Sequence, residues 1–192
     1  MSKLKLVLII SILTLNFSKS FSQDTQDDFA PFLAKTIKKA SLREEADSSS
    51  KVKLSLPLNS QLYVFSENDI DGYLKVIDIR TNKLGYVKKS LIKKIKDLPL
   101  SQNNSFEESG QSSSSEPEVE IKNTTSLTIS LIVGSKYFSL PPHATSTETI
   151  ESGDLNYTAS APSVLPLSGK HYFKAGGKYT WTFTIRTTYR RR

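Results

Sequence analysis

The chain of 192 residues contains no cysteine, two histidines and one tryptophan. Without cysteine it can form no disulfide framework, no thiolate metal site and no thiol redox site. Any domain that it forms must therefore be held together by its hydrophobic core. If the chain is exported, this composition favours a bacterial periplasmic or surface protein, because small secreted eukaryotic domains normally depend on disulfides.

Two histidines also leave few routes to catalysis or metal binding. His143 and His171 lie in separate predicted loops of the C-terminal part, without a recognisable zinc spacing. Ser168 precedes His171 in a turn-like sequence that lacks the nucleophile elbow of hydrolases. Asp69 and Asp71 match only part of a calcium-binding loop, so a hairpin turn is favoured there. We expect a protein that is not an enzyme and has no catalytic residue, no metal site and no cofactor.

Long apolar runs are scarce as well, and the one at residues 6–15 follows the basic residues Lys3 and Lys5. Small residues suited to cleavage come next, so residues 1–23 are predicted to be a signal peptide. The run is short for a bilayer span, which takes about 20 apolar residues. Retention as an N-terminal anchor is the alternative. We expect export to the periplasm, the cell surface or the medium.

Charge is divided among three segments. Residues 35–96 hold 14 Lys and Arg against seven Asp and Glu, residues 97–120 hold six acids and no base, and residues 121–192 hold nine bases against three acids. Two basic modules thus flank an acidic segment. Basic modules favour anionic partners such as wall polymers or lipid headgroups, and a solvated basic surface is the simpler interpretation. Nucleic acid is disfavoured, because export is expected and no basic–aromatic recognition motif is present.

The acidic segment is rich in Ser, Asn, Gln and Glu, and Phe106 is its one large aromatic residue. Such a composition buries too little apolar surface to offset the entropy of ordering the chain. Residues 97–117 are therefore predicted to be a disordered linker between a domain at 36–96 and a domain at 118–188.

Both domains show the alternation of apolar and polar residues that is typical of β-strands. In the first domain, which suits a small open barrel, strands are predicted at 52–56, 61–65, 73–79 and 84–87. The entry segment at 30–39 is compatible with either a helical turn or a strand. In the second domain, an antiparallel β-sandwich with one wet face per sheet is predicted from the alternation at 126–133, 155–159 and 178–186.

Three short motifs lie in order within the first domain: Leu42-Arg43, Gly72-Tyr73-Leu74-Lys75-Val76 and Gly85-Tyr86-Val87. Their order and spacing resemble the bacterial SH3-like (SH3b) family, in which a Leu-Arg pair opens the domain and Gly-Trp motifs begin two later strands. Tyrosine stands in place of both tryptophans here. The resemblance implies an SH3-like barrel that binds a cell-wall or other extracellular ligand.

The residue types in and around these motifs define a candidate ligand-binding surface. Tyrosine combines an apolar ring with a polar tip, which suits sugar rings, peptide backbones and prolines, and nearby cations would add charge. The predicted ligand-binding residues are Tyr63, Tyr73, Tyr86, Arg43, Lys75 and Lys88. The alternative is that one or more of these tyrosines belongs to the core.

The expected fold is thus all-β, with an SH3-like barrel, a disordered linker and a C-terminal β-sandwich. The expected function is that of an exported, non-enzymatic binding protein of the bacterial cell envelope, whose first domain engages peptidoglycan or a peptide or protein ligand. The alternative is a structural or assembly subunit that docks onto other envelope proteins. Membrane contact would come only from an uncleaved signal or from the basic tail, Arg190–Arg192.

Overall fold

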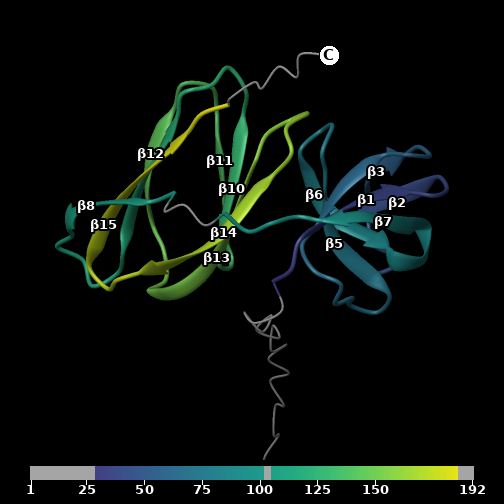
Figure 1. The fold of residues 1–192 in the computed structure, drawn as a ribbon, viewed down its shortest axis with the longest axis horizontal. Helices are drawn as coiled ribbons and strands as arrows, with labels where there is room; N and C mark the ends of the chain where they lie inside the picture. Colours follow the sequence, from purple (N-terminus) through teal and green to yellow (C-terminus); the bar gives the residue numbers. More distant parts are fainter. Residues whose placement is uncertain (1–28, 102–104, 186–192) are drawn as a thin grey trace, which may run out of the picture.

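The computed structural model describes residues 29–101 and 105–185, which form two β-modules lying side by side (Figure 1). Strands make up nearly all of the regular structure, and the described residues contain no α-helix, so the all-β prediction is confirmed. No helix in these two ranges is long and apolar enough to cross a membrane. The predicted signal peptide at 1–23 and the basic tail lie outside the described residues.

The first module is a single antiparallel sheet of seven strands in the order β3-β2-β6-β5-β4-β1-β7. Its strands are β1 (Phe32–Thr36), β2 (Ala40–Arg43), β3 (Val52–Leu56), β4 (Gln61–Val64), β5 (Tyr73–Asp78), β6 (Lys83–Lys88) and β7 (Ile92–Asp97). The sheet stays open, because β3 and β7 each pair with one neighbour only in the described chain. Both terminal strands carry exposed lysines, which disfavour pairing between sheet edges.

The entry segment at 30–39, which was compatible with a helical turn or a strand, contains strand β1. In β1, Phe32, Ala34 and Thr36 are buried while the residues between them are partly exposed, which is the period of two that a strand requires. This strand pairs with β4 on one side and β7 on the other, so it occupies an interior position in the sheet.

The sheet buries apolar side chains on both of its faces. The inner face carries the main core of the module, formed by Phe32, Ala34, Ala40, Leu42, Leu56, Leu62, Val64, Leu74, Val76 and Val87. On the opposite, outer face, Tyr63 lies across from Ile77, and Ile77 lies across from Leu84. We call these three residues the interface row. Tyr63 and Ile77 are almost completely buried, so something must cover this part of the outer face.

The second module, which supplies that cover, consists of two four-stranded sheets in the orders β11-β10-β13-β14 and β12-β9-β15-β8. Its strands are β8 (Glu107–Gln111), β9 (Glu118–Asn123), β10 (Ile129–Val133), β11 (Lys136–Leu140), β12 (Thr145–Thr149), β13 (Gly153–Ser160), β14 (Leu167–Phe173) and β15 (Gly177–Phe183). One continuous core draws residues from both sheets, including Leu131, Tyr157 and Trp181. The structure is thus the predicted sandwich, with the addition of one parallel strand pair between β9 and β15.

The acidic segment contradicts the prediction of a disordered linker at 97–117. Glu107 to Gln111 form β8, which pairs with β15 at the edge of the second module. Phe106 is only 2% exposed and packs edge-on against Tyr157 and Phe173 in the core. The average composition of the segment conceals this single anchor, and backbone pairing requires no apolar side chain on an edge strand.

Hydrogen bonds connect the two modules. The Tyr63 hydroxyl bonds to the hydroxyls of Ser168, at 2.5 Å, and Thr158, at 3.4 Å, and these two hydroxyls bond to each other at 2.9 Å. The Ser163 amide donates to the Ile79 carbonyl at 2.8 Å. The outer face of the first module is therefore partly buried against β13, β14 and the loop between them.

Candidate functional site

The first and third sequence motifs of the first module meet where β2 pairs with β6. An added Cβ on Gly85 would lie 2.4 Å from the Arg43 carbonyl oxygen and 2.9 Å from Leu42 Cγ. Only glycine allows β2 to approach β6 this closely. The close approach places Leu42 in the inner core and sets Arg43 directly across from Tyr86.

A line of four side chains crosses neighbouring strands on the outer face: Arg43, Tyr86, Lys75 and Phe65. Tyr86 pairs with Arg43 on β2 and with Lys75 on β5, and directly paired residues share one face of a sheet. The backbone amide of Phe65, next to the end of β4, donates to the Lys75 carbonyl. We call these four residues the cation–aromatic row. It runs parallel to the interface row and one side-chain pair further along the strands.

The cations of this row are held in place by local contacts. Lys75 Nζ lies 5.3 Å from the centre of the Phe65 ring, within the range of a cation–π interaction. The Arg43 guanidinium donates to the Ser50 carbonyl at 2.6 Å, so the loop after β2 fixes its position. Phe65 is a site residue that sequence reasoning missed. Its alternation with Tyr63 at the end of a predicted strand was the available signal.

Two further predicted residues lie beside the row. Tyr73 pairs with Lys88 on the same outer face, two residues beyond Lys75 and Tyr86. Lys88 is exposed, while Tyr73 is only 9% exposed and offers little of its ring to a ligand. The structure therefore brings together five of the six predicted residues, with Tyr86 and the cations as the accessible members.

Tyr63, the sixth predicted residue, is placed elsewhere. It is completely buried at the module interface and is therefore inaccessible to a ligand. Burial raises the pKa of its phenol to about 12, against the opposing effect of the hydrogen bonds from Ser168 and Thr158. Its assignment to the ligand-binding surface is wrong, because the second module covers that part of the face.

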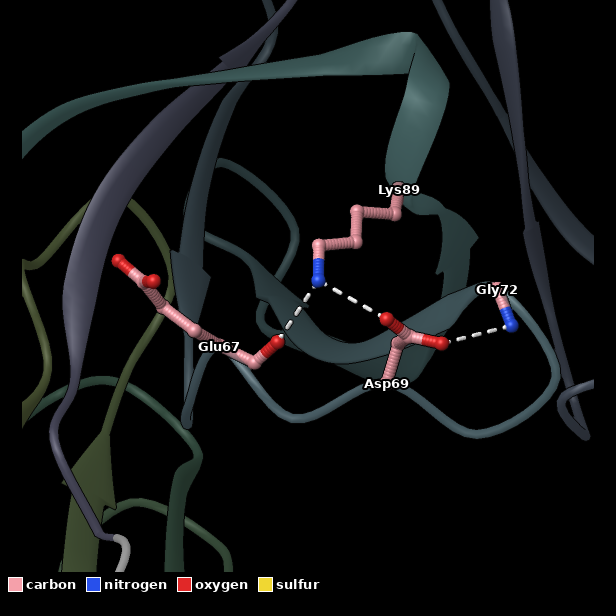
Figure 2. Close-up of polar contacts among 4 residues, drawn as sticks. All are labelled: Glu67, Asp69, Gly72 and Lys89. Atoms are coloured by element: carbon pink, nitrogen blue, oxygen red, sulfur yellow. Dashed lines mark hydrogen bonds and ion pairs between the residues drawn. The ribbon is translucent and has the colours of Figure 1, made fainter.

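The loop before β5 is braced by the side chains shown in Figure 2. Lys89 Nζ donates to the Glu67 carbonyl at 3.0 Å and to Asp69 Oδ2 at 2.8 Å. The Gly72 amide donates to Asp69 Oδ1 at 2.9 Å. These contacts, the one from Lys89 first, lower the pKa of the Asp69 carboxyl. Asp69 thus has a structural partner at each oxygen.

The predicted hairpin turn is confirmed within this loop. Asp71 and Gly72 have φ of 51° and 79°, and Ile70 and Tyr73 exchange two backbone hydrogen bonds at 2.9 Å. Positive φ at both central residues is the signature of a two-residue type I′ turn, for which Asp-Gly is well suited. The turn and the Lys89 contacts fix the start of β5 and therefore the position of Tyr73.

The histidines do not form a reactive constellation. His171 lies in strand β14, not in the predicted loop, and its ring packs 4.6 Å from Phe173 and 5.2 Å from Phe106, measured between ring centres. Burial lowers the pKa of its imidazole. Among the described residues, no group of three or more His, Asp or Glu side chains is placed to hold a metal ion.

The geometry of the cation–aromatic row suits non-covalent recognition. It presents the positive charges of Arg43 and Lys75 on either side of the Tyr86 ring. Comparisons with protein-family models, curated proteins and solved structures found no match to this chain.

Proposed function

We propose that the protein is an exported, non-enzymatic binding protein of the bacterial cell envelope. Its first module would engage the peptidoglycan of the cell wall, or a peptide segment, through the cation–aromatic row and the adjacent Lys88. The single observation that carries the proposal is the placement of Tyr86 between Arg43 and Lys75 on the outer face, where all three residues remain partly exposed.

The chemistry of the row supports this class of ligand. The ammonium and guanidinium groups are hydrogen-bond donors that match carboxylates, while the tyrosine ring offers an apolar face to a sugar or peptide. Peptidoglycan supplies both of these features along one polymer. The resemblance of the three motifs to the SH3b family, and the apolar run after Lys3 and Lys5, support the compartment in which such a ligand occurs.

Sedimentation with purified peptidoglycan tests the proposal directly. The full chain should be retained, and Arg43→Met together with Lys75→Met should weaken retention about tenfold, the loss expected for roughly 1.4 kcal/mol of charge-assisted contact. Tyr86→Ala should weaken retention similarly. Retention should also fall as salt is raised, because the charges are near the surface.

Matched controls remove the same charge elsewhere. Lys93→Met on β7 together with Lys174→Met in the second module changes two exposed lysines away from the row and should leave retention unchanged. Equal loss in the control and row variants would reduce the effect to net charge and contradict the proposed site. If the wild-type chain is not retained and instead co-purifies with an envelope protein, the structural-subunit alternative replaces wall binding.

A further inference from the structure

A cleft of about 360 Å³ opens where the two modules meet. Lys53, Asn82, Lys83 and Leu84 of the first module line it, together with Tyr137 of the second. Its volume lies near the lower end of the range for small-molecule sites, which are often found at domain interfaces. None of these five residues belongs to the cation–aromatic row.

The two sides of the cleft are tied together by a chain of hydrogen bonds. Asn82, with φ of 57°, is fixed by the hydrogen bond that its backbone amide donates to the Asp78 carbonyl at 2.8 Å. Its Nδ2 donates to Ser130 Oγ across the interface at 3.0 Å, and Ser130 Oγ bonds to the Tyr137 hydroxyl at 2.9 Å. The phenol ring of Tyr137 is therefore anchored at its tip, while the residue remains 51% exposed. The cleft has a pre-positioned aromatic wall.

The polar groups that the cleft offers are donors. Lys53 and Lys83 are exposed, and neither forms an ion pair with another residue in the described ranges. No carboxylate lines the cleft. The Asn82 Oδ1 atom is buried, so the one side-chain amide oxygen at the site is withheld from a ligand. A ligand that fits must bring acceptors and negative charge.

We propose that this cleft binds an acidic saccharide, meaning a sugar ring that bears a carboxylate. The apolar face of the ring would pack on Tyr137 and Leu84, and the carboxylate and hydroxyl oxygens would accept hydrogen bonds from Lys53 and Lys83. An acidic peptide would satisfy the two lysines but brings no sugar ring to pack on Tyr137 and Leu84, so it is the competing ligand that the test below includes. The site is separate from the proposed wall-binding row and does not depend on it.

Titration of the isotope-labelled full chain with glucuronate, followed by amide chemical shifts in NMR, tests the proposal. Shifts should concentrate at Lys53, Asn82, Lys83, Leu84 and Tyr137. Neutral glucose and acetate, which each supply only half of the recognised chemistry, should produce shifts at least about tenfold weaker at equal concentration. Glucose or acetate acting as strongly as glucuronate would overturn the proposal, as would shifts located elsewhere.

Variants locate the contacts. Tyr137→Ala and the pair Lys53→Met and Lys83→Met should each weaken glucuronate binding about tenfold. Tyr172→Ala, which truncates another exposed tyrosine of the second module, and Lys93→Met with Lys174→Met should not change it. Tyr137→Phe keeps the ring, and it checks that the loss of glucuronate binding in Tyr137→Ala does not come from a folding defect. Equal weakening by the control variants, or tighter binding of a Glu-containing dipeptide at the same amides, would replace the saccharide with another ligand class.

Discussion

The interface row and the cation–aromatic row lie next to each other on the outer face of the first module, yet they differ in burial. Tyr63 begins one row and is completely buried, while Tyr86 stands in the other and is partly exposed. Both are tyrosines on the outer face of the first module. What separates them is the second module, whose Thr158 and Ser168 contact Tyr63, while Tyr86 keeps part of its surface exposed.

This difference shows that the role of an outward-facing tyrosine is decided by what packs against it. Thr158 and Ser168 satisfy the Tyr63 hydroxyl inside the interface, so the phenol becomes part of the core. Tyr86 is instead flanked by Arg43 and Lys75, whose charges favour an aqueous surface. The boundary between the buried and the partly exposed part of this face therefore passes between two side-chain pairs of one sheet.

The largest test of the comparison is truncation of each tyrosine. Tyr63→Ala should lower the free energy of unfolding by about 4 kcal/mol, because it leaves a cavity at the interface and two hydroxyls without their partner. Tyr86→Ala should lower it by about 1 kcal/mol or less, the range of strand propensity at a half-buried position. Urea denaturation measures both values. Similar losses for the two variants would remove the distinction between the rows.

Gly85 offers a way to disturb one row without the other. Gly85→Ala should destabilise the protein by about 3 kcal/mol, because its Cβ meets the backbone of Arg43 and the side chain of Leu42. Gly72→Ala, at an open position with φ of 79°, should lose only about 1 kcal/mol through backbone strain. Thermal denaturation compares the two. In amide spectra of Gly85→Ala, the largest shifts should fall at Arg43 and Tyr86, with small ones at Tyr63.

Tyr63→Phe isolates the hydroxyl from the ring. At neutral pH it should lower the free energy of unfolding by about 1 kcal/mol, since Thr158 and Ser168 still bond to each other. The folded-state pKa of Tyr63, about 12, lies above the ordinary value of 10.0, so the folded state favours the protonated phenol. Its contribution to stability is complete below pH 10 and is lost as pH rises through 12.

That pH dependence distinguishes wild type from variant. Across this range the wild-type chain should lose roughly 2 kcal/mol more than Tyr63→Phe, which has no group to ionise at this position. Urea denaturation at a series of alkaline pH values gives the difference and cancels the titration of the remaining tyrosines and lysines. Parallel pH profiles for the two proteins would mean that Tyr63 is not buried as described.

The smallest effect on stability is expected in the uncovered row. Lys75→Met removes a partly exposed cation–π contact with Phe65 and should change the free energy of unfolding by about 0.5 kcal/mol. The same substitution should weaken retention on peptidoglycan. Calorimetry measures the stability of the variant, and sedimentation of the same preparation measures its retention. A variant that is strongly destabilised but binds normally would reverse the assignment of the two rows.

Much of the fold could be predicted because the local signals agree with one another. Alternation located β5 and β6, and Asp71-Gly72 marked the hairpin turn between Ile70 and Tyr73. In the second module the run at 178–186 contains most of β15. These features depend on residues that are close in sequence, where the period of two and the turn chemistry act directly.

The failures share a long-range cause. The sequence around Tyr63 does not predict its contact with Ser168, which lies 105 residues later. The Ser-rich segment likewise does not predict that β8 pairs with the edge of β15. Phe106 was visible as a lone aromatic, but its value depends on Tyr157 and Phe173, which are distant in sequence. Residue type and motif position marked Tyr63 and Tyr86 as candidates for a binding surface. They could not show how far the neighbouring module extends over that surface.

The hydroxyl triangle of Tyr63, Thr158 and Ser168 has a consequence for how this protein can change over evolutionary time. A gene rearrangement that moved the first module alone into another chain would carry an exposed apolar strip and a phenol without its partners. The two modules are therefore expected to be inherited as a pair. Substitution at position 63 should also be linked to positions 158 and 168. Homologues with phenylalanine at position 63 should tolerate smaller or apolar residues at positions 158 and 168.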